Sequence, residues 1–406
     1  MNNKKSKICK SAKLLMSSDL IYTLTSLFVK TFLVAYFLKV TNDSIIQISI
    51  YYIIMYTLSG IGKILIGKVV KSNPQYRTKV LSMGIVLRAV FILFIVILKE
   101  NIATYFPIVA ILYGISEVFY WTSHEVLYID VTTNENRKDY MSIKTILGKI
   151  INIIAPVILG SSIELYSFTK IAIYIFILSV IQIIISLQIK TDKNETLITN
   201  KYSIKTFLED LNNSQKIKIN KYTKSAIAYG VIESSMQTLV VIITIMTFKT
   251  SFNLGILTSV FSICSMIAMY LYKNFYNRNN SKFVLYLCSS LIVIGVIGLV
   301  FDINKITLVI YNFVYTISIC ILGVIYDTKK GDLVKECNIE EWKVEWVSYV
   351  VLFMHLGRIS GYILMLIAGL FNNIIVFKIL LILVTLFAPI CTKLMYGVEK
   401  IKVHED

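Results

Sequence analysis

Five residues with chemically useful side chains recur at helical spacing in one long apolar segment. Glu117, Tyr120, Trp121, His124 and Tyr128 are separated by steps of three, one, three and four positions. In an α-helix such steps place side chains on one face, which here carries one carboxyl, one imidazole and three aromatic rings. The carboxyl can carry a proton, the imidazole can titrate near neutral pH, and aromatic rings can stack on an organic ligand.

Other ionisable residues also lie deep within long apolar segments, among them Lys30 and Glu233. In a membrane each such residue costs ~2.5 to 3.5 kcal/mol to insert unless it has a partner or water. Lys30 lies too deep to reach the membrane surface easily. It therefore either pairs with Glu117 or Glu233, or it faces a cavity and binds an anionic ligand, and the sequence leaves both alternatives open.

The composition identifies the apolar segments as membrane spans. The 406-residue chain is 56% hydrophobic and only 16% charged, with a mean hydropathy of +0.71. Because a bilayer-spanning helix takes ~20 residues, the apolar residues suffice for roughly a dozen spans and exclude a large soluble domain. No stretch alternates polar and apolar residues as a membrane β-strand would, so the spans are predicted to be helices.

We predict an all-α membrane protein with twelve transmembrane helices in two six-helix, pseudo-symmetric halves. Residues 1–189 form the N-terminal half and residues 225–406 the C-terminal half. The polar segment 190–224 is a linker, in which apolar residues recur at helical spacing over 204–211 and predict an interfacial helix. The predicted spans are 19–38, 44–66, 80–98, 103–128, 145–166, 171–189, 225–248, 252–272, 283–301, 306–326, 347–371 and 375–396.

The basic residues predict how the chain is oriented. Of the 41 Lys and Arg residues, 30 fall in one set of alternate loops and at the two termini, six in the opposite loops and five inside spans. Since cytoplasmic loops retain basic residues, both termini are predicted to be cytoplasmic in a plasma (inner) membrane. The net charge of +17 is thus an orientation signal and not a sign of nucleic-acid binding. Lys63, near a span end, is expected to snorkel to the cytoplasmic surface.

The two halves are related by an internal repeat with an offset of 207 to 209 positions. Leu147–Ile150 in the fifth span matches Leu356–Ile359 in the eleventh, so Lys149 and Arg358 are mates. Both lie beside a Gly, where helices can approach closely and where pairing with structural partners is the alternative to a ligand role. Lys30 of the first span falls on Gln237 of the seventh. Two parallel repeats of six helices are an arrangement typical of secondary transporters.

On this architecture, the chain resembles the major facilitator superfamily of secondary transporters over nearly its whole length. Gly67–Lys79 keeps the Gly and the basic end of the family's loop between spans two and three, with Lys71 near the place of the family's acid. Gly148, Ala155–Pro156 and Gly160–Ser161 partly match the fifth-span pattern of the family's antiporters. The fourth span lacks the Arg common in proton-coupled drug exporters, so a typical drug exporter is disfavoured.

The resemblance implies that spans one, four, seven and ten line a central cavity. Glu117 or Glu233 is then expected to carry a coupling proton, whereas Arg88 is interpreted as structural because the third span is peripheral in the family fold. For His124 the alternative is a position exposed to water near the cytoplasmic end of the fourth span. The candidates for the substrate or proton pathway are Lys30, Glu117, Tyr120, Trp121, His124, Lys149, Glu233, Gln237 and Arg358.

The sequence carries no signal of an enzyme, a metal site or a cofactor. It has no phosphate-binding Gly loop of Walker type, and its three histidines are isolated. We predict a monomeric, secondary active permease that is coupled to protons or another ion. It would move a small organic solute with anionic character across the bilayer by alternating access.

Two alternatives remain open for the function. One is an efflux antiporter for amphipathic compounds, which the aromatic helix face and the fifth-span pattern favour. The other is a transport-inactive membrane scaffold or sensor with the same fold. The intramembrane charges favour transport, because a scaffold has no need to bury them at their insertion cost.

Overall fold

In a computed structural model of the protein, the described residues are 8–42, 44–133, 136–190, 202–275, 280–371 and 373–401. This part of the chain is almost entirely helical and contains no strand. The principal helices are α1 Lys10–Leu27, α2 Val34–Val40, α3 Ile45–Ser72, α4 Arg77–Leu98, α5 Ile102–Asp130, α6 Arg137–Leu165, α7 Phe168–Leu187, α8 Ile204–Glu209, α9 Asn213–Gly230, α10 Gln237–Phe248, α11 Ser251–Phe275, α12 Ser281–Phe301, α13 Lys305–Glu336, α14 Lys343–Phe371, α15 Ile374–Thr385 and α16 Phe387–Glu399.

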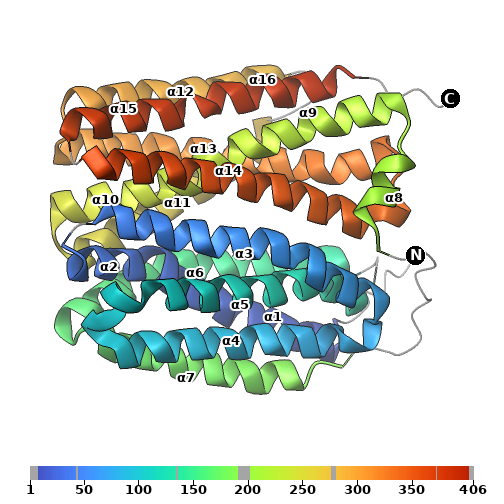
Figure 1. Ribbon diagram of the computed structural model, residues 1–406, viewed down its shortest axis with the longest axis horizontal. Helices are drawn as coiled ribbons and strands as arrows, with labels where there is room; N and C mark the ends of the chain where they lie inside the picture. The colour runs from blue at the N-terminus through green and yellow to red at the C-terminus, as the bar shows by residue number, and fades with distance from the viewer. Residues whose placement is uncertain are drawn as a thin grey trace.

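The helices form two halves side by side, with both chain ends at the same end of the bundle (Figure 1). We call this the terminal end and the opposite one the far end. Within the described residues, eleven helical stretches are long and apolar enough to cross a membrane. One of them, Pro74–Tyr128, contains both α4 and α5, which a short turn separates at Lys99–Asn101. Twelve membrane-crossing helices in two halves confirm the predicted fold class.

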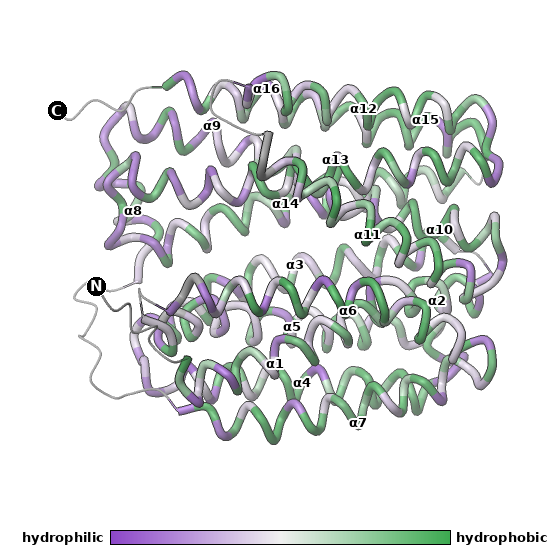
Figure 2. The backbone as a smooth tube through the Cα atoms, turned by 180° about the vertical axis from the view of Figure 1, so that it is seen from behind, coloured by the Kyte–Doolittle hydropathy of each residue, from purple (hydrophilic) through white to green (hydrophobic). Residues whose placement is uncertain are grey.

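Hydropathy along the backbone agrees with a multi-pass membrane protein. Hydrophobic residues occupy the middle of the bundle, and hydrophilic residues gather toward its ends, above all the terminal end (Figure 2). On α6, Ile146, Ile150, Ile154 and Ile158 recur every four residues, and each is exposed on the outside of the protein. A stripe of exposed isoleucines at this spacing forms one apolar helix face, which is suited to lipid.

The seventh span begins earlier than the apolar pattern predicts. Its first helix, α9, begins at Asn213 and not at residue 225. The Asn212 side chain accepts a hydrogen bond from the Gln215 backbone N–H, and the Gln215 side chain accepts one from the Asn212 backbone N–H. This capping box starts the helix in polar sequence, so its first turns extend beyond the apolar segment.

The linker segment contains a short helix that packs on the protein. Within the predicted linker helix, α8 places the fully buried Phe207 against Trp342 and Tyr349, at ring-centroid distances of 6.2 and 6.3 Å. The linker residues 191–201 lie outside the described part of the chain. Phe207 therefore covers the terminal end of α14, and its ring is not available to the membrane interface.

Glycines allow the halves to approach closely toward the far end. A Cβ atom added to Gly160 of α6 would lie 2.5 Å from the carbonyl oxygen of Ser251, and one added to Gly255 of α11 would lie 2.2 Å from that of Pro156. Close backbone packing of this kind requires residues without a side chain. The partial antiporter pattern of the fifth span thus corresponds here to an interface between halves. Nearer the terminal end, Gly148 of α6 has open space around it.

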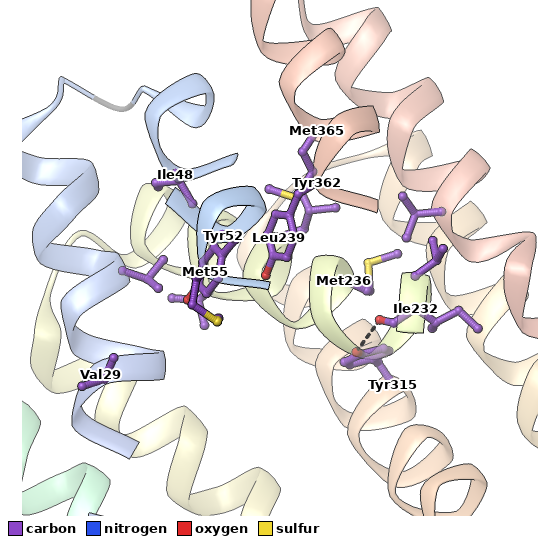
Figure 3. Close-up of a cluster of buried hydrophobic side chains, with 14 of the residues drawn as sticks. Val29, Ile48, Tyr52, Met55, Ile232, Met236, Leu239, Tyr315, Tyr362 and Met365 are labelled. Carbon is purple, nitrogen blue, oxygen red and sulfur yellow. Dashed lines mark hydrogen bonds between the residues drawn. The ribbon is translucent and has the colours of Figure 1, made fainter. Parts of the chain in front are cut away.

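Two further contacts join the halves. The outer segments of the first and seventh spans, α2 and α10, touch toward the far end, and α3 packs along α14. At the middle of the α3–α14 contact, the rings of Tyr52 and Tyr362 stack with centroids 4.6 Å apart (Figure 3). These contacts position the space that is left between the halves.

Candidate functional site

The space between the two halves contains two adjoining cavities of about 230 and 540 Å³. Lys30, Trp121, Glu233 and Gln237 line both of them, so we treat the two as one central cavity. Its walls come from the first, second, fourth and fifth spans of one half and the seventh, eighth, tenth and eleventh of the other. A site with ionisable groups from both halves is thereby formed in the middle of an apolar bundle.

Each half begins with a helix that is locally widened where it meets the cavity. The first span is a π-helix over Phe28–Leu33 (η1), and the seventh span is a π-helix over Val231–Met236 (η4). These segments carry Lys30 and Glu233, the charged residues that these two spans contribute to the cavity. Because π turns in helices occur frequently at functional sites, their position supports a role for this region.

Glu117 is held by a network from three helices of the N-terminal half. Its carboxylate accepts hydrogen bonds from Arg88 at 2.6 Å and from the Tyr22 hydroxyl. Arg88 also donates to Ser26 Oγ at 2.9 Å and lies over the Tyr22 ring, 4.2 Å from its centroid. Arg88, which the sequence analysis interpreted as structural, thus contacts a candidate residue directly, because its long side chain reaches from the peripheral third span to the acid.

Glu233 forms the corresponding ion pair in the C-terminal half. The Arg358 guanidinium donates to its carboxylate through Nε at 3.0 Å and through the adjacent terminal nitrogen at 2.9 Å. Arg358 also lies over the Tyr56 ring, 5.0 Å from the centroid. Its repeat mate Lys149 lies outside the central cavity, near Cys320 of α13, so the two members of this repeat pair occupy different environments.

Lys63 and Glu125 form a third ion pair in the cavity wall, with a nitrogen–oxygen distance of 2.5 Å. The prediction that Lys63 snorkels to the surface was wrong, since the residue is buried. Glu125 lies one turn after Trp121 on the same helix, so it faces the same cavity and is within reach of Lys63.

Lys30 is exposed to the cavity and has no hydrogen-bond or ion-pair partner in the described part of the chain. Pairing with Glu117 or Glu233 was one of the two alternatives derived from the sequence. That alternative was wrong, because Arg88 and Arg358 hold these acids. Gln237, the repeat mate of Lys30, lines the same cavity from the other half.

His124 and Tyr120 belong to a separate buried cluster toward the terminal end. Asp19 of α1 accepts hydrogen bonds from the Tyr120 hydroxyl at 2.7 Å and pairs with His124 at 2.8 Å and with Lys144 of α6 at 2.7 Å. Both alternatives predicted for His124, a place in the cavity wall and a water-exposed helix end, were therefore wrong, because the side chain is buried against Asp19. Trp121 instead lines the cavity with a partly exposed ring.

Polar side chains that were not among the candidates from the sequence also line the cavity, and one pair of them connects the two halves. Ser234 donates to the Tyr56 hydroxyl at 2.9 Å, and the hydroxyls of Thr238 and Tyr362 are 2.7 Å apart. A signal for Ser234 and Thr238 was present, since they lie four apart in the seventh span and each directly follows a candidate. Their partners belong to the second and eleventh spans, outside the four spans that the family resemblance predicted to line the cavity.

The two helical halves around a charged central cavity define the class of the protein as a membrane transporter. A family model described as Major Facilitator Superfamily matches residues 18–328, and the chain belongs to that superfamily. The resemblance seen in the sequence is thereby confirmed, and the protein is a transporter and not an enzyme. A comparison with curated protein sequences finds no match.

Solved structures with the same fold come from transporters of different solutes. A bacterial homologue of the iron transporter ferroportin, in an inward-facing state, superposes with a TM-score of 0.72 at 12% identity, over 97% of this chain and 100% of that one. The nucleoside transporter NupG gives 0.72 at 12% identity, over 97% and 100%. The peptide transporter POT in complex with alafosfalin gives 0.70 at 12% identity, over 97% and 96%. At this identity the likeness shows the fold alone.

Proposed function

We propose that the protein is a monomeric secondary active transporter that moves a small organic solute with an anionic group by alternating access. It lies in the plasma (inner) membrane with both termini cytoplasmic, because the loops of the terminal end carry most of the basic residues. The observation that carries the proposal is the central cavity, in which charged residues of both halves meet in the middle of the membrane. Such charges are costly, and a substrate and ion pathway accounts for them.

Protons are the coupling ion in this proposal, taken up by Glu233 or Glu117. Each acid pairs with an Arg, so a proton can reach and neutralise the acid only where its pair is open to water in the cavity. The Glu233–Arg358 pair is the more accessible, with side chains 25% and 16% exposed, against 14% for Glu117 and 1% for Arg88. This difference favours Glu233 as the group that exchanges protons with water in the cavity.

Export of amphipathic compounds remains the second candidate, because Trp121 and several tyrosines offer flat surfaces for stacking. A lipophilic cation would need an acid without a partner. All three acids of the cavity wall, Glu117, Glu125 and Glu233, have a basic partner. The charge balance therefore favours anionic over cationic substrates.

A thermal-shift screen followed by transport in proteoliposomes tests the proposal. Purified protein is heated with a panel of anionic metabolites and of lipophilic cations, and compounds that stabilise it are then tested for uptake under an imposed pH gradient. We expect stabilisation and gradient-dependent uptake of an anion. Stabilisation by cations alone would support the efflux candidate, and ligand binding without flux would support a scaffold or sensor.

The variant Glu233→Gln sharpens this experiment. It should abolish accumulation driven by the pH gradient while sparing downhill exchange of the same compound. Glu209→Gln is the matched control, because Glu209 lies on the exposed side of α8, far from the cavity. Unchanged proton-driven accumulation in Glu233→Gln, at normal protein abundance, would remove Glu233 from the coupling mechanism.

A further inference from the structure

The central cavity carries one positive charge more than its acids can balance. Every acid in its wall is paired at 2.5 to 2.9 Å with a basic residue, in the pairs Glu117–Arg88, Glu125–Lys63 and Glu233–Arg358. His355 also lines the cavity, where it contacts Ser59 at 3.2 Å and Arg358 at 3.4 Å. Lys30 has no partner among the described residues, so its ammonium is left over.

The positive charge of Lys30 needs hydration, which it has only while water fills the cavity. A transporter that works by alternating access must close its cavity on one side before it opens on the other, and closure removes water from the groups inside. The three ion pairs can enter a closed cavity because each is neutral as a unit, whereas the ammonium of Lys30 would lose its hydration without compensation. Closure of the empty cavity is therefore disfavoured by this residue.

We propose that Lys30 binds a single anionic group of the substrate and that this anion is the condition for closure. With one carboxylate or one other singly charged group on Lys30, the cavity is neutral and can close. Without a bound anion, in contrast, the protein switches slowly from one access state to the other. The protein therefore exchanges one anion for another much faster than it moves anions in one direction. This inference rests on the proposed function and adds the charge of the substrate and the mode of transport.

The surroundings of Lys30 define the rest of the ligand. Trp121 and Tyr22 line the cavity on the side of the N-terminal half, with their rings edge to face at 5.3 Å between centroids. Gln237 and Asn152 add amide groups that can donate to and accept from a neutral polar group. A monoanion with an aromatic or flat apolar body and a neutral hydrogen-bonding group fits this cavity. A dianion would leave one negative charge without a partner.

The test measures closure directly and needs no known ligand. A cysteine replaces Asn152, which lines the cavity, in protein whose six native cysteines are replaced by Ser. A membrane-impermeant maleimide is added at the far end, where α2 of one half contacts α10 of the other. Labelling then requires the empty cavity to close on the terminal side and to open on the far side.

We expect slow labelling with Lys30 present and labelling at least about tenfold faster with Lys30→Gln, which copies the repeat mate Gln237 and removes the charge. Lys30→Arg keeps the charge and should label slowly. Lys170→Gln removes an exposed Lys at the far end and should also label as the parent protein does. Equal labelling rates for the parent protein and Lys30→Gln would overturn the inference.

A second readout separates this inference from the proposed function. Benzoate, benzamide and benzylamine share one ring and differ in charge, so they are added to the same labelling reaction. We expect benzoate alone to accelerate labelling of the parent protein, and this acceleration to disappear in Lys30→Gln. Acceleration by benzamide or benzylamine to the same degree would contradict the charge requirement. If the terminal side labels but the far side never does, in any variant and with any of the three compounds, alternating access itself fails.

Discussion

Replacing Glu117 with Gln removes the acid from an interior ion pair and leaves Arg88 without a counter-charge. Arg88 is almost completely buried, with 1% of its side chain exposed, so water cannot replace the carboxylate. Removal of one partner from a buried pair costs about 3 to 5 kcal/mol. Arg88 keeps its hydrogen bond to Ser26 and its position over the Tyr22 ring, and the new amide oxygen can still accept a hydrogen bond.

We therefore expect Glu117→Gln to lower the free energy of unfolding by about 3 kcal/mol, at the lower end of that range. This is a change of roughly two orders of magnitude in the ratio of folded to unfolded protein. The double variant Glu117→Gln with Arg88→Met removes both charges and keeps most of the volume. It should recover most of the loss, to within about 1 kcal/mol of the parent protein.

The assay is denaturant unfolding of the four proteins of this cycle in one detergent, together with their abundance in membranes. The two single variants should be less stable and less abundant than the double variant. If Glu117→Gln and Arg88→Met destabilise additively, with no recovery in the double variant, the ion pair does not stabilise the protein. The description of Glu117 as a member of a stabilising pair would then be refuted.

Three further predictions follow from other contacts. Lys71→Met should lower the free energy of unfolding by about 3 kcal/mol, measured by denaturant unfolding. The substitution leaves the carboxylate of the fully buried Glu345, which lies 2.5 Å from the Lys71 ammonium, without its ion-pair partner. Gly357→Ala should lower the free energy of unfolding by about 1 to 3 kcal/mol in the same assay, since the added Cβ would lie 2.0 Å from a carbonyl oxygen of α9. A Cys at Asn373 should react with an impermeant maleimide in intact cells and one at Asn213 should not, and the reverse pattern would refute the orientation.

The sequence predicted the architecture well because the bilayer imposes simple rules. Apolar runs of the required length mark the helices, and the matching Lys149 and Arg358 segments mark the two halves. Helix ends were less predictable. The Asn212 capping box begins α9 in polar sequence, where hydropathy carries no signal for a membrane helix.

The composition of the cavity was only partly predictable. Glu117 and Trp121 were identified because three- and four-residue steps define a helix face. The same steps also grouped His124 with them, yet that residue turns toward Asp19 on another helix. The partner of Glu117 could not be deduced, since Arg88 reaches it across a contact between helices that no local pattern records.

The distance between the halves at each end of the bundle tests alternating access most directly. Spin labels are placed on exposed residues, as one pair at the terminal end on Met141 and Tyr270 and another at the far end on Tyr105 and Ile306. Electron–electron distance measurements in lipid nanodiscs are then made with and without a ligand from the thermal-shift screen. We predict that the ligand shifts the two distance distributions in opposite directions, one end closing as the other opens. Distributions that stay unchanged at both ends, or that move in the same direction, would contradict the account.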